Sequence, residues 1–202
     1  PKTYETFSNG LTIGVFQFSK PKMREYLNKL KPKNINDLAA MNALYRPGPM
    51  DLIPDFIDRK HGRKDVSYLH PSMEQVLKET YGVIVYQEQV MQLVRVIAGY
   101  SLAEADLVRR AMGKKDEKLM KEQEKEFSNR AVKNGYNKKT AGEIFKLILK
   151  FADYGFNKSH SVAYSILAYQ TAYLKTHYPI EFMTSQLNCR YEDMDEMVLL
   201  IN

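Results

Sequence analysis

The feature that most constrains the fold is the spacing of apolar residues in GVIVYQEQVMQLVRVIAGY, residues 82–100. Val90, Leu93, Val94 and Ile97 occupy positions i, i+3, i+4 and i+7, which form one face of an α-helix. The glycine at position 99 favours the end of that helix. The segment is therefore predicted to be an amphipathic helix whose apolar face packs into a core.

Similar signals predict helices along most of the chain. Ser101 and Glu104 have capping-box spacing, which favours a helix that starts there and stops at Gly113. Thr140 is expected to cap a later helix. The patterns predict helices at 23–30, 37–45, 70–82, 101–113, 114–134, 140–154 and 161–178. Strand signals are sparse, although TIGVFQF, residues 12–18, alternates weakly and could form a short strand.

We therefore predict a mainly α, multi-helix fold with few short strands. No boundary is sharp, so residues 1–202 are interpreted as one domain fragment. Within it, residues 1–65 should be a loop-rich N-terminal part and residues 66–202 a helical part. The N-terminal part is interrupted by five prolines, Pro21, Pro32, Pro47, Pro49 and Pro54.

Composition indicates a polyanionic partner. The 202 residues carry a formal net charge of +6, and the pI is about 9.2. This favours nucleic acid or another phosphate-rich ligand, although many domains are mildly basic without such a role. The single cysteine, Cys189, excludes an internal disulfide and fits a reducing cytosol, so a cytoplasmic protein is expected. No stretch approaches the roughly 18 consecutive apolar residues of a membrane span, so no membrane partner is expected.

The segment YGFNKSHS, residues 154–161, concentrates polar donors just before the last long predicted helix. Gly155 allows backbone angles that other residues resist, and Lys158 and His160 add charge and a titratable donor. A helix N-terminus with unpaired N–H groups attracts anions. Tyr154 and Asn157 could then contact a sugar or base. The alternative is an ordinary capped helix entrance without a ligand.

Two further clusters are rich in cations. RRAMGKK, residues 109–115, has four cations at a predicted helix end: Arg109, Arg110, Lys114 and Lys115. Arginine and lysine there suit a triphosphate or a DNA backbone, and Asp106 is a possible partner for one of the arginines. RKHGRK, residues 59–64, contains Lys60, and Arg46 lies nearby in sequence. Both clusters could instead be solvated surface.

Catalytic signals are weak. Asp193 and Asp195 have the spacing of a two-metal site but lie in a polar stretch near the chain end. The four histidines show no ligand spacing, and no nucleophile–base pair or phosphate-binding loop is visible. No metal site is therefore predicted. Taken alone, the residues predict a phosphate-binding chain that does not obviously catalyse a reaction.

Seven segments, in this order, resemble the fingers region of the bacterial DNA polymerase III alpha subunit, a family C replicative polymerase. They extend over nearly the whole chain from residue 12 to about 190. The segments are GVFQF (14–18), ALYRPGP (43–49), FIDRKHG (56–62), TYGVIVYQEQVM (80–91), AGYSLAEADLVRRAMGKK (98–115), FADYGFNKSHSVAY (151–164) and TAYLKTHYPIEFM (171–183).

The resemblance implies that this chain is part of a DNA-directed DNA polymerase, a nucleotidyltransferase of DNA replication. In this family the catalytic aspartates lie in a palm domain upstream, so the palm would hold Mg²⁺ and this fragment alone should be inactive. The fingers close over the incoming dNTP and guide the template. Expected partners are the DNA primer-template, the dNTP, the palm and thumb of the same chain, and replisome subunits such as the sliding clamp through other regions.

The resemblance also implies roles for individual residues. No catalytic residue is expected in this fragment. The residues expected to bind the nucleotide are Arg109, Arg110, Tyr154, Gly155, Asn157, Lys158 and His160. Those expected to touch DNA or phosphate are Arg46, Lys60, Lys114 and Lys115.

One segment departs from the family pattern. After FQF, where the family commonly has an acidic residue, this chain reads SKPKM, residues 19–23, which is more basic. Two alternatives also remain open. A basic helical DNA-binding module would bind DNA but ignore nucleoside triphosphates. A self-contained phosphotransfer enzyme using His160 would turn over by itself, although it lacks visible metal carboxylates.

Overall fold

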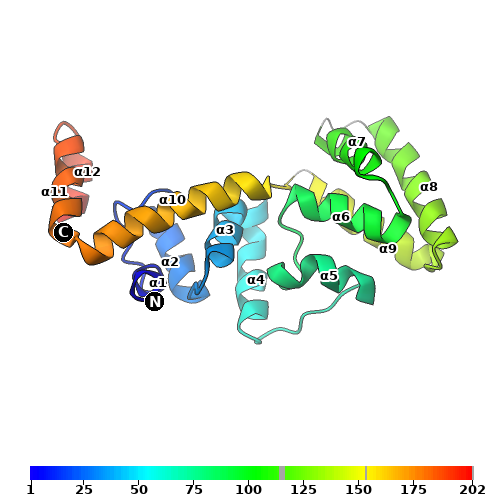
Figure 1. The fold of residues 1–202 in the computed structure, drawn as a ribbon, viewed down its shortest axis with the longest axis horizontal. Helices are drawn as coiled ribbons and strands as arrows, with labels where there is room; N and C mark the ends of the chain where they lie inside the picture. Colours follow the sequence, from blue (N-terminus) through cyan, green and yellow to red (C-terminus); the bar gives the residue numbers. More distant parts are fainter. Residues whose placement is uncertain (114–116, 153, 202) are drawn as a thin grey trace. The chain divides into compact units, whose positions relative to one another are not determined.

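The structure, a computed structural model, consists almost entirely of helices and connecting turns (Figure 1). It describes residues 1–113, 117–152 and 154–201. Within these ranges there is no strand, only an isolated bridge between Tyr86 and Phe156. The prediction of a mainly α fold is confirmed. None of the described helices combines the length and the apolar character needed to cross a lipid bilayer.

The chain forms two compact units. Unit 1 comprises Pro1–Tyr45 and Ser159–Asn202, and unit 2 comprises Arg46–Lys158. Unit 2 therefore contains residues from both sides of position 65, where the sequence suggested a change from loop-rich to helical structure.

Unit 1 is held together by aromatic and small buried residues. Its helices are α1 (Lys2–Ser8), α2 (Pro21–Leu30), α3 (Ile35–Leu44), α10 (Lys158–His177), α11 (Pro179–Cys189) and α12 (Met194–Ile201). The first residue of α10, Lys158, belongs to unit 2. The rings of Phe7 and Phe18 meet edge to face at 5.5 Å and are fully buried. The Oγ of Ser161 donates to the carbonyl of Ala39 at 2.5 Å, so α10 approaches α3 closely.

The N-terminal part contains more helix than the loop-rich description implied. The reason is the placement of its prolines. Pro21, Pro49 and Pro54 stand in the first turns of α2, η1 (Pro49–Leu52) and α4 (Ile53–Lys60). A proline fits there because the first helical N–H groups have no intrahelical acceptor.

The short strand suggested at 12–18 is wrong, because these residues form consecutive turns. Val15 N donates to Thr12 O at 3.0 Å, and Phe18 N donates to Val15 O at 3.2 Å. Val15 and Phe18 are both buried, so the segment buries residues three apart rather than alternate ones. Gly14 and Gln17 have positive φ angles, which a strand does not allow.

Unit 2 is a helical core centred on α6 (Gln87–Ala98). Before α6 come α4, η2 (Pro71–Met73), α5 (Glu74–Leu77) and η3 (Lys78–Thr80), and after it come α7 (Leu102–Gly113), α8 (Glu117–Lys133) and α9 (Lys138–Ala152). The predicted apolar face of α6 is at most 2% exposed at Val90, Leu93, Val94 and Ile97, which confirms it. The helix ends at Gly99 in the left-handed conformation, with φ of 67°. Helices α7, α8 and α9 pack against α6.

The predicted helix boundaries are partly right. The capping box is confirmed, because Ser101 N donates to Glu104 Oε2 at 2.8 Å and Glu104 N donates to Ser101 Oγ at 3.2 Å. Thr140 does not cap α9, which begins earlier, at Lys138, with Asn137 Oδ1 accepting from Lys139 N. Helix α10 likewise begins three residues before the predicted start, at Lys158.

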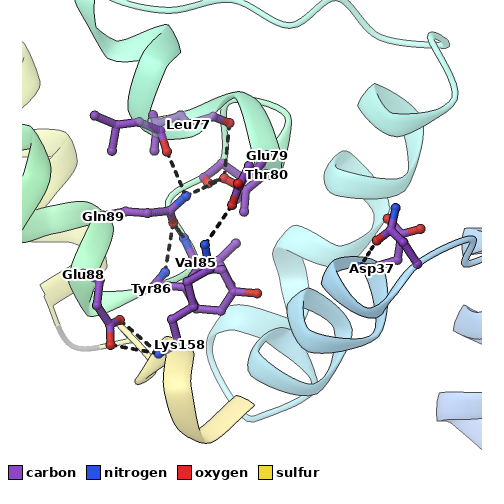
Figure 2. A network of polar contacts seen from close by, with 12 residues as sticks. Asp37, Leu77, Glu79, Thr80, Val85, Tyr86, Glu88, Gln89 and Lys158 are labelled. Atoms are coloured by element: carbon purple, nitrogen blue, oxygen red, sulfur yellow. Dashed lines mark hydrogen bonds and ion pairs between the residues drawn. The ribbon is translucent and has the colours of Figure 1, made fainter. Parts of the chain in front are cut away.

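A buried glutamine fixes the chain entering α6 (Figure 2). The side chain of Gln89 is in the first turn of α6 and only 5% exposed. Its Oε1 accepts from the backbone N–H groups of Val85 at 2.8 Å and Tyr86 at 3.0 Å. Its Nε2 donates to Thr80 Oγ1 at 2.8 Å and to Val76 O at 3.3 Å. One side chain therefore holds η3 and the extended segment 83–86 together.

We expect Gln89→Leu to lower the free energy of unfolding. The buried N–H groups of Val85 and Tyr86 would lose their acceptor, at roughly 1–3 kcal/mol for each donor. Urea unfolding followed by circular dichroism measures the loss. Gln92→Leu, at an exposed position of the same helix, is the matched control. An unchanged unfolding midpoint for Gln89→Leu would contradict the role given to this network.

A second expectation concerns Gly48, whose φ is 96° and where a Cβ would lie 2.2 Å from Cε1 of Tyr154. Gly48→Ala should destabilise unit 2 more than Gly62→Ala. Gly62 has φ of 69° but open space around it, so its substitution adds only left-handed strain of roughly 1–2 kcal/mol. Thermal melts compare the two variants, and Tyr154→Ala should restore part of the stability of Gly48→Ala. Equal melting temperatures for the two glycine variants would rule out the clash.

Candidate phosphate-binding site

The turn from Tyr154 to Lys158 connects α9 to α10 and is fixed along its length within unit 2. Phe156 N donates to Val85 O at 3.2 Å, and Gln87 N donates to Phe156 O at 2.9 Å. Together they form the isolated parallel bridge, which attaches the middle of the turn to the entrance of α6. The turn therefore keeps a defined position beside the first turn of α6.

Gly155 is needed for close packing and not for an unusual backbone angle. Its φ is not positive, contrary to the expectation from sequence. A Cβ at this position would lie 3.0 Å from Cγ of Gln87 and 3.5 Å from the backbone of the same residue. The glycine therefore lets the turn approach the start of α6.

Arg46 also contacts this turn. Its Nη2 donates to Tyr154 O at 2.7 Å, and its guanidinium carbon lies 4.4 Å from the centre of the Phe156 ring. Burial lowers the pKa of the Arg46 guanidinium from its ordinary value. These contacts give Arg46 a structural role in unit 2, and its contact with DNA or phosphate stays a prediction.

Carboxylates from neighbouring segments engage the polar end of the turn (Figure 2). Glu88 accepts from Lys158 N with Oε1 at 3.1 Å and Oε2 at 2.9 Å, and from Asn157 Nδ2 with Oε1 at 2.8 Å. The ammonium of Lys158 lies 2.8 Å from Glu79 Oε2 and 5.7 Å from the centre of the Tyr86 ring. The first N–H of the predicted anion-attracting helix end is thus engaged by a side chain of the protein itself.

Arg109 and Arg110 share one carboxylate on α7. Nη2 of Arg109 lies 2.8 Å from Asp106 Oδ1, and Nε of Arg110 lies 2.7 Å from Asp106 Oδ2. The hydrogen bond from Arg109 is the main cause that lowers the pKa of Asp106. The predicted partnership with Asp106 is confirmed. The side chain of Arg110 is 65% exposed and that of Arg109 is 34% exposed, so both can reach a ligand from outside.

The remaining predicted residues are dispersed. Lys60 ends α4 and is half-buried, next to Arg59, which is paired with Asp55. His160 lies in unit 1, where its ring centre is 4.0 Å from that of Tyr164. The lysines at 114 and 115 lie outside the described residues.

The structure thus brings together four of the predicted nucleotide-binding residues in the turn, Tyr154, Gly155, Asn157 and Lys158. It pairs Arg109 with Arg110 separately on α7. Among the described residues, no group of three or more histidine, cysteine or acidic side chains could hold a metal ion.

Sequence reasoning missed the acidic and amide residues that organise the turn. Gln87, Glu88 and Gln89 are consecutive, and each makes a different contact. Gln87 lies against Gly155, Glu88 accepts from Lys158, and Gln89 forms the buried network. The only local signal was an acidic residue in the first turn of a helix, which helix dipoles favour in any protein. No short-range pattern indicated that this carboxylate would meet a second helix.

Comparison with known proteins gives a consistent family. Residues 1–135 match the model of the bacterial DNA polymerase III alpha subunit finger domain. The DNA polymerase III subunit alpha of Halalkalibacterium halodurans is 50% identical over 200 residues, covering 99% of this chain and 18% of that protein. The subunit of Campylobacter jejuni is 51% identical over 203 residues, covering 100% of this chain and 17% of that protein.

A third relative, the DNA polymerase III subunit alpha of Borreliella burgdorferi, is 50% identical over 196 residues, covering 97% of this chain and 17% of that protein. The chain thus spans less than a fifth of the length of these relatives. The family model matches 135 of its 202 residues, which is about two thirds. The chain therefore belongs to the family of the bacterial DNA polymerase III alpha subunit finger domain.

Proposed function

We propose that this chain is the fingers of a bacterial replicative DNA polymerase, where it binds the triphosphate of the incoming dNTP and guides the template DNA. The observation that carries the proposal is the fixed turn. It holds Asn157 and Lys158 beside the entrance of α6 while leaving the Lys158 side chain 39% exposed. The nucleotide-binding set is Arg109, Arg110, Tyr154, Gly155, Asn157, Lys158 and His160.

The connection between α6 and α7 supports a common ligand for Lys158 and the two arginines. The helices pack against each other and are separated only by residues 99–101. We infer that the two helices form an αα-hairpin, which would bring the end of α7 toward the start of α6. Arg109 and Arg110 are near the end of α7, and the turn is hydrogen-bonded to the start of α6. In such a hairpin, cations from both segments would face one ligand.

The ion pairs of Lys158 and Arg110 could exchange their carboxylates for phosphate oxygens. Glu79 is 60% exposed in its pair with Lys158, and Arg110 is 65% exposed in its pair with Asp106. Exposed pairs of this kind contribute only about 0–1 kcal/mol, so their loss costs little. A triphosphate offers more negative charge and accepts bidentate contacts from arginine. Nucleotide binding would then replace these carboxylates with phosphate oxygens.

The proposed reaction of the complete enzyme is attack of a primer 3′-hydroxyl on the α-phosphate of the dNTP, with release of pyrophosphate. Mg²⁺ held by the palm would polarise the phosphate oxygens. The residues of this chain would orient the triphosphate and place positive charge where negative charge develops on the leaving pyrophosphate.

The wider partners are proposals of the same kind. Lys60, Lys114 and Lys115 would contact the DNA backbone. Arg46 would also contact it while keeping its hydrogen bond to Tyr154 O and its contact with the Phe156 ring. The palm and thumb of the same polymerase chain would complete the site, and the sliding clamp would bind through other regions. A replicative polymerase is expected to act in the cytoplasm.

We expect Arg110→Ala and Lys158→Ala, each in the complete polymerase, to slow dNTP incorporation by roughly 10²–10³-fold, as loss of a transition-state donor does elsewhere. Melting temperature should change little, because both side chains are partly exposed. Single-turnover incorporation and thermal melts measure the two effects. Arg95→Ala, at an exposed position of α6, is the control. Unchanged incorporation with an unchanged melting temperature would contradict the proposed roles.

The 202-residue chain alone should bind primer-template DNA weakly and in a salt-sensitive way, because phosphate contacts release counterions. It should extend no primer when supplied with Mg²⁺ and dNTPs, since the palm carboxylates are expected elsewhere. Fluorescence anisotropy at increasing salt concentration measures DNA binding, and a gel assay measures primer extension. Detectable synthesis by this chain would overturn the division of labour.

A further inference from the structure

Glu88 contacts two of the residues proposed to bind the nucleotide, although it is not itself one of them. It is the second residue of α6, and its carboxylate accepts from two donors at the entrance of α10: the Lys158 N–H, shared between both oxygens, and Asn157 Nδ2. The distances from Lys158 N to the two carboxylate oxygens, 3.1 and 2.9 Å, are ordinary for N–H···O hydrogen bonds. Glu88 is half-buried, and its contacts with Lys158 N are partly buried while that with Asn157 Nδ2 is exposed.

This carboxylate joins the N-termini of two helices. Lys158 is the first residue of α10, and Glu88 is in the first turn of α6. Both helix ends carry partial positive charge, so one anion between them satisfies both. With Glu88 in place, the first N–H of α10 is already used as a donor. A phosphate that accepts from this particular N–H would have to displace Glu88.

The direction of the Lys158 side chain follows from the same arrangement. Its backbone N–H is fixed by Glu88, while its ammonium lies against Glu79 and over the ring of Tyr86. The ion pair with Glu79 is exposed and exchangeable, whereas the contacts of Glu88 fix the backbone from which the side chain extends. The partly exposed ammonium is thus the group of Lys158 that a phosphate can reach without displacing Glu88.

We propose that Glu88 is a positioning residue for nucleotide binding: it closes the N-terminus of α10 and fixes Asn157 and Lys158 in the orientation that meets the triphosphate. The proposal rests on the proposed function, since it assigns to Glu88 an effect transmitted through Lys158. The rest of the turn does not depend on Glu88. Phe156 pairs with the backbone before α6, and Arg46 packs on the Phe156 ring. Loss of Glu88 should therefore loosen residues 157–158 and leave the fold intact.

The test uses three single variants of the complete polymerase, Glu88→Ala, Glu88→Gln and Lys158→Ala. A fourth, double variant combines Glu88→Ala with Lys158→Ala. Single-turnover kinetics give the dNTP dissociation constant and the maximal rate for each. Glu88→Ala should lower the ratio of rate to dissociation constant by roughly 10- to 100-fold, as expected for slight misplacement of a binding group. Glu88→Gln should be less impaired, because its amide oxygen still accepts from Lys158 N. Glu74→Ala, at an exposed residue in the first turn of α5, is the control.

The double variant separates positioning from plain stability. If Glu88 acts through Lys158, adding Glu88→Ala to Lys158→Ala should cost less than about threefold, because the two effects share one contact. The proposal would be overturned if the kinetic effects of the two substitutions were fully additive. It would also be overturned if the variants lost activity in proportion to their loss of melting temperature. Normal kinetics of Glu88→Ala beside an impaired Lys158→Ala would overturn it as well. A fully active Lys158→Ala would instead overturn the proposed function.

Discussion

The position of the proposed nucleotide-binding residues 154–158 depends on hydrogen bonds between the first turn of α6 and the turn before α10. Gln87 N donates to Phe156 O at 2.9 Å, and Glu88 accepts from Lys158 N. The buried side chain of Gln89 fixes the backbone that makes these contacts possible. Because these bonds are made mostly by backbone groups and a buried amide, the turn has a defined place before any ligand arrives. Preorganisation of this kind lowers the cost of binding.

Three of the cations proposed to bind phosphate form ion pairs with carboxylates of the chain itself. Asp106 forms ion pairs with Arg109 and Arg110, and Glu79 forms one with Lys158. Without such partners, like charges brought near one another would repel. On the proposed function, the site would fold with its cations paired and then exchange these carboxylates for triphosphate oxygens. Glu88 differs from these exchangeable partners because it contacts backbone as well as side chain, and so remains where the helix begins.

Short-range patterns predicted much of this fold, because their causes are local. The apolar face of α6, the capping box at Ser101 and the pairing with Asp106 all follow from spacings of three or four residues. The contact of Glu88 with Lys158 joins residues 70 positions apart, and no periodicity encodes it. The close approach behind Gly155 and the burial of Gln89 are likewise tertiary effects. The prolines of the N-terminal part misled the prediction, since a proline suits both loops and first helical turns.

The most direct test is a structure of the complete polymerase with primer-template DNA and an incoming dNTP. We expect the guanidinium of Arg110 and the ammonium of Lys158 to lie within hydrogen-bond distance of the same triphosphate, with Glu88 still capping α10. If these two cations faced different cavities, or if the triphosphate occupied the helix end in place of Glu88, the proposed nucleotide site would be wrong.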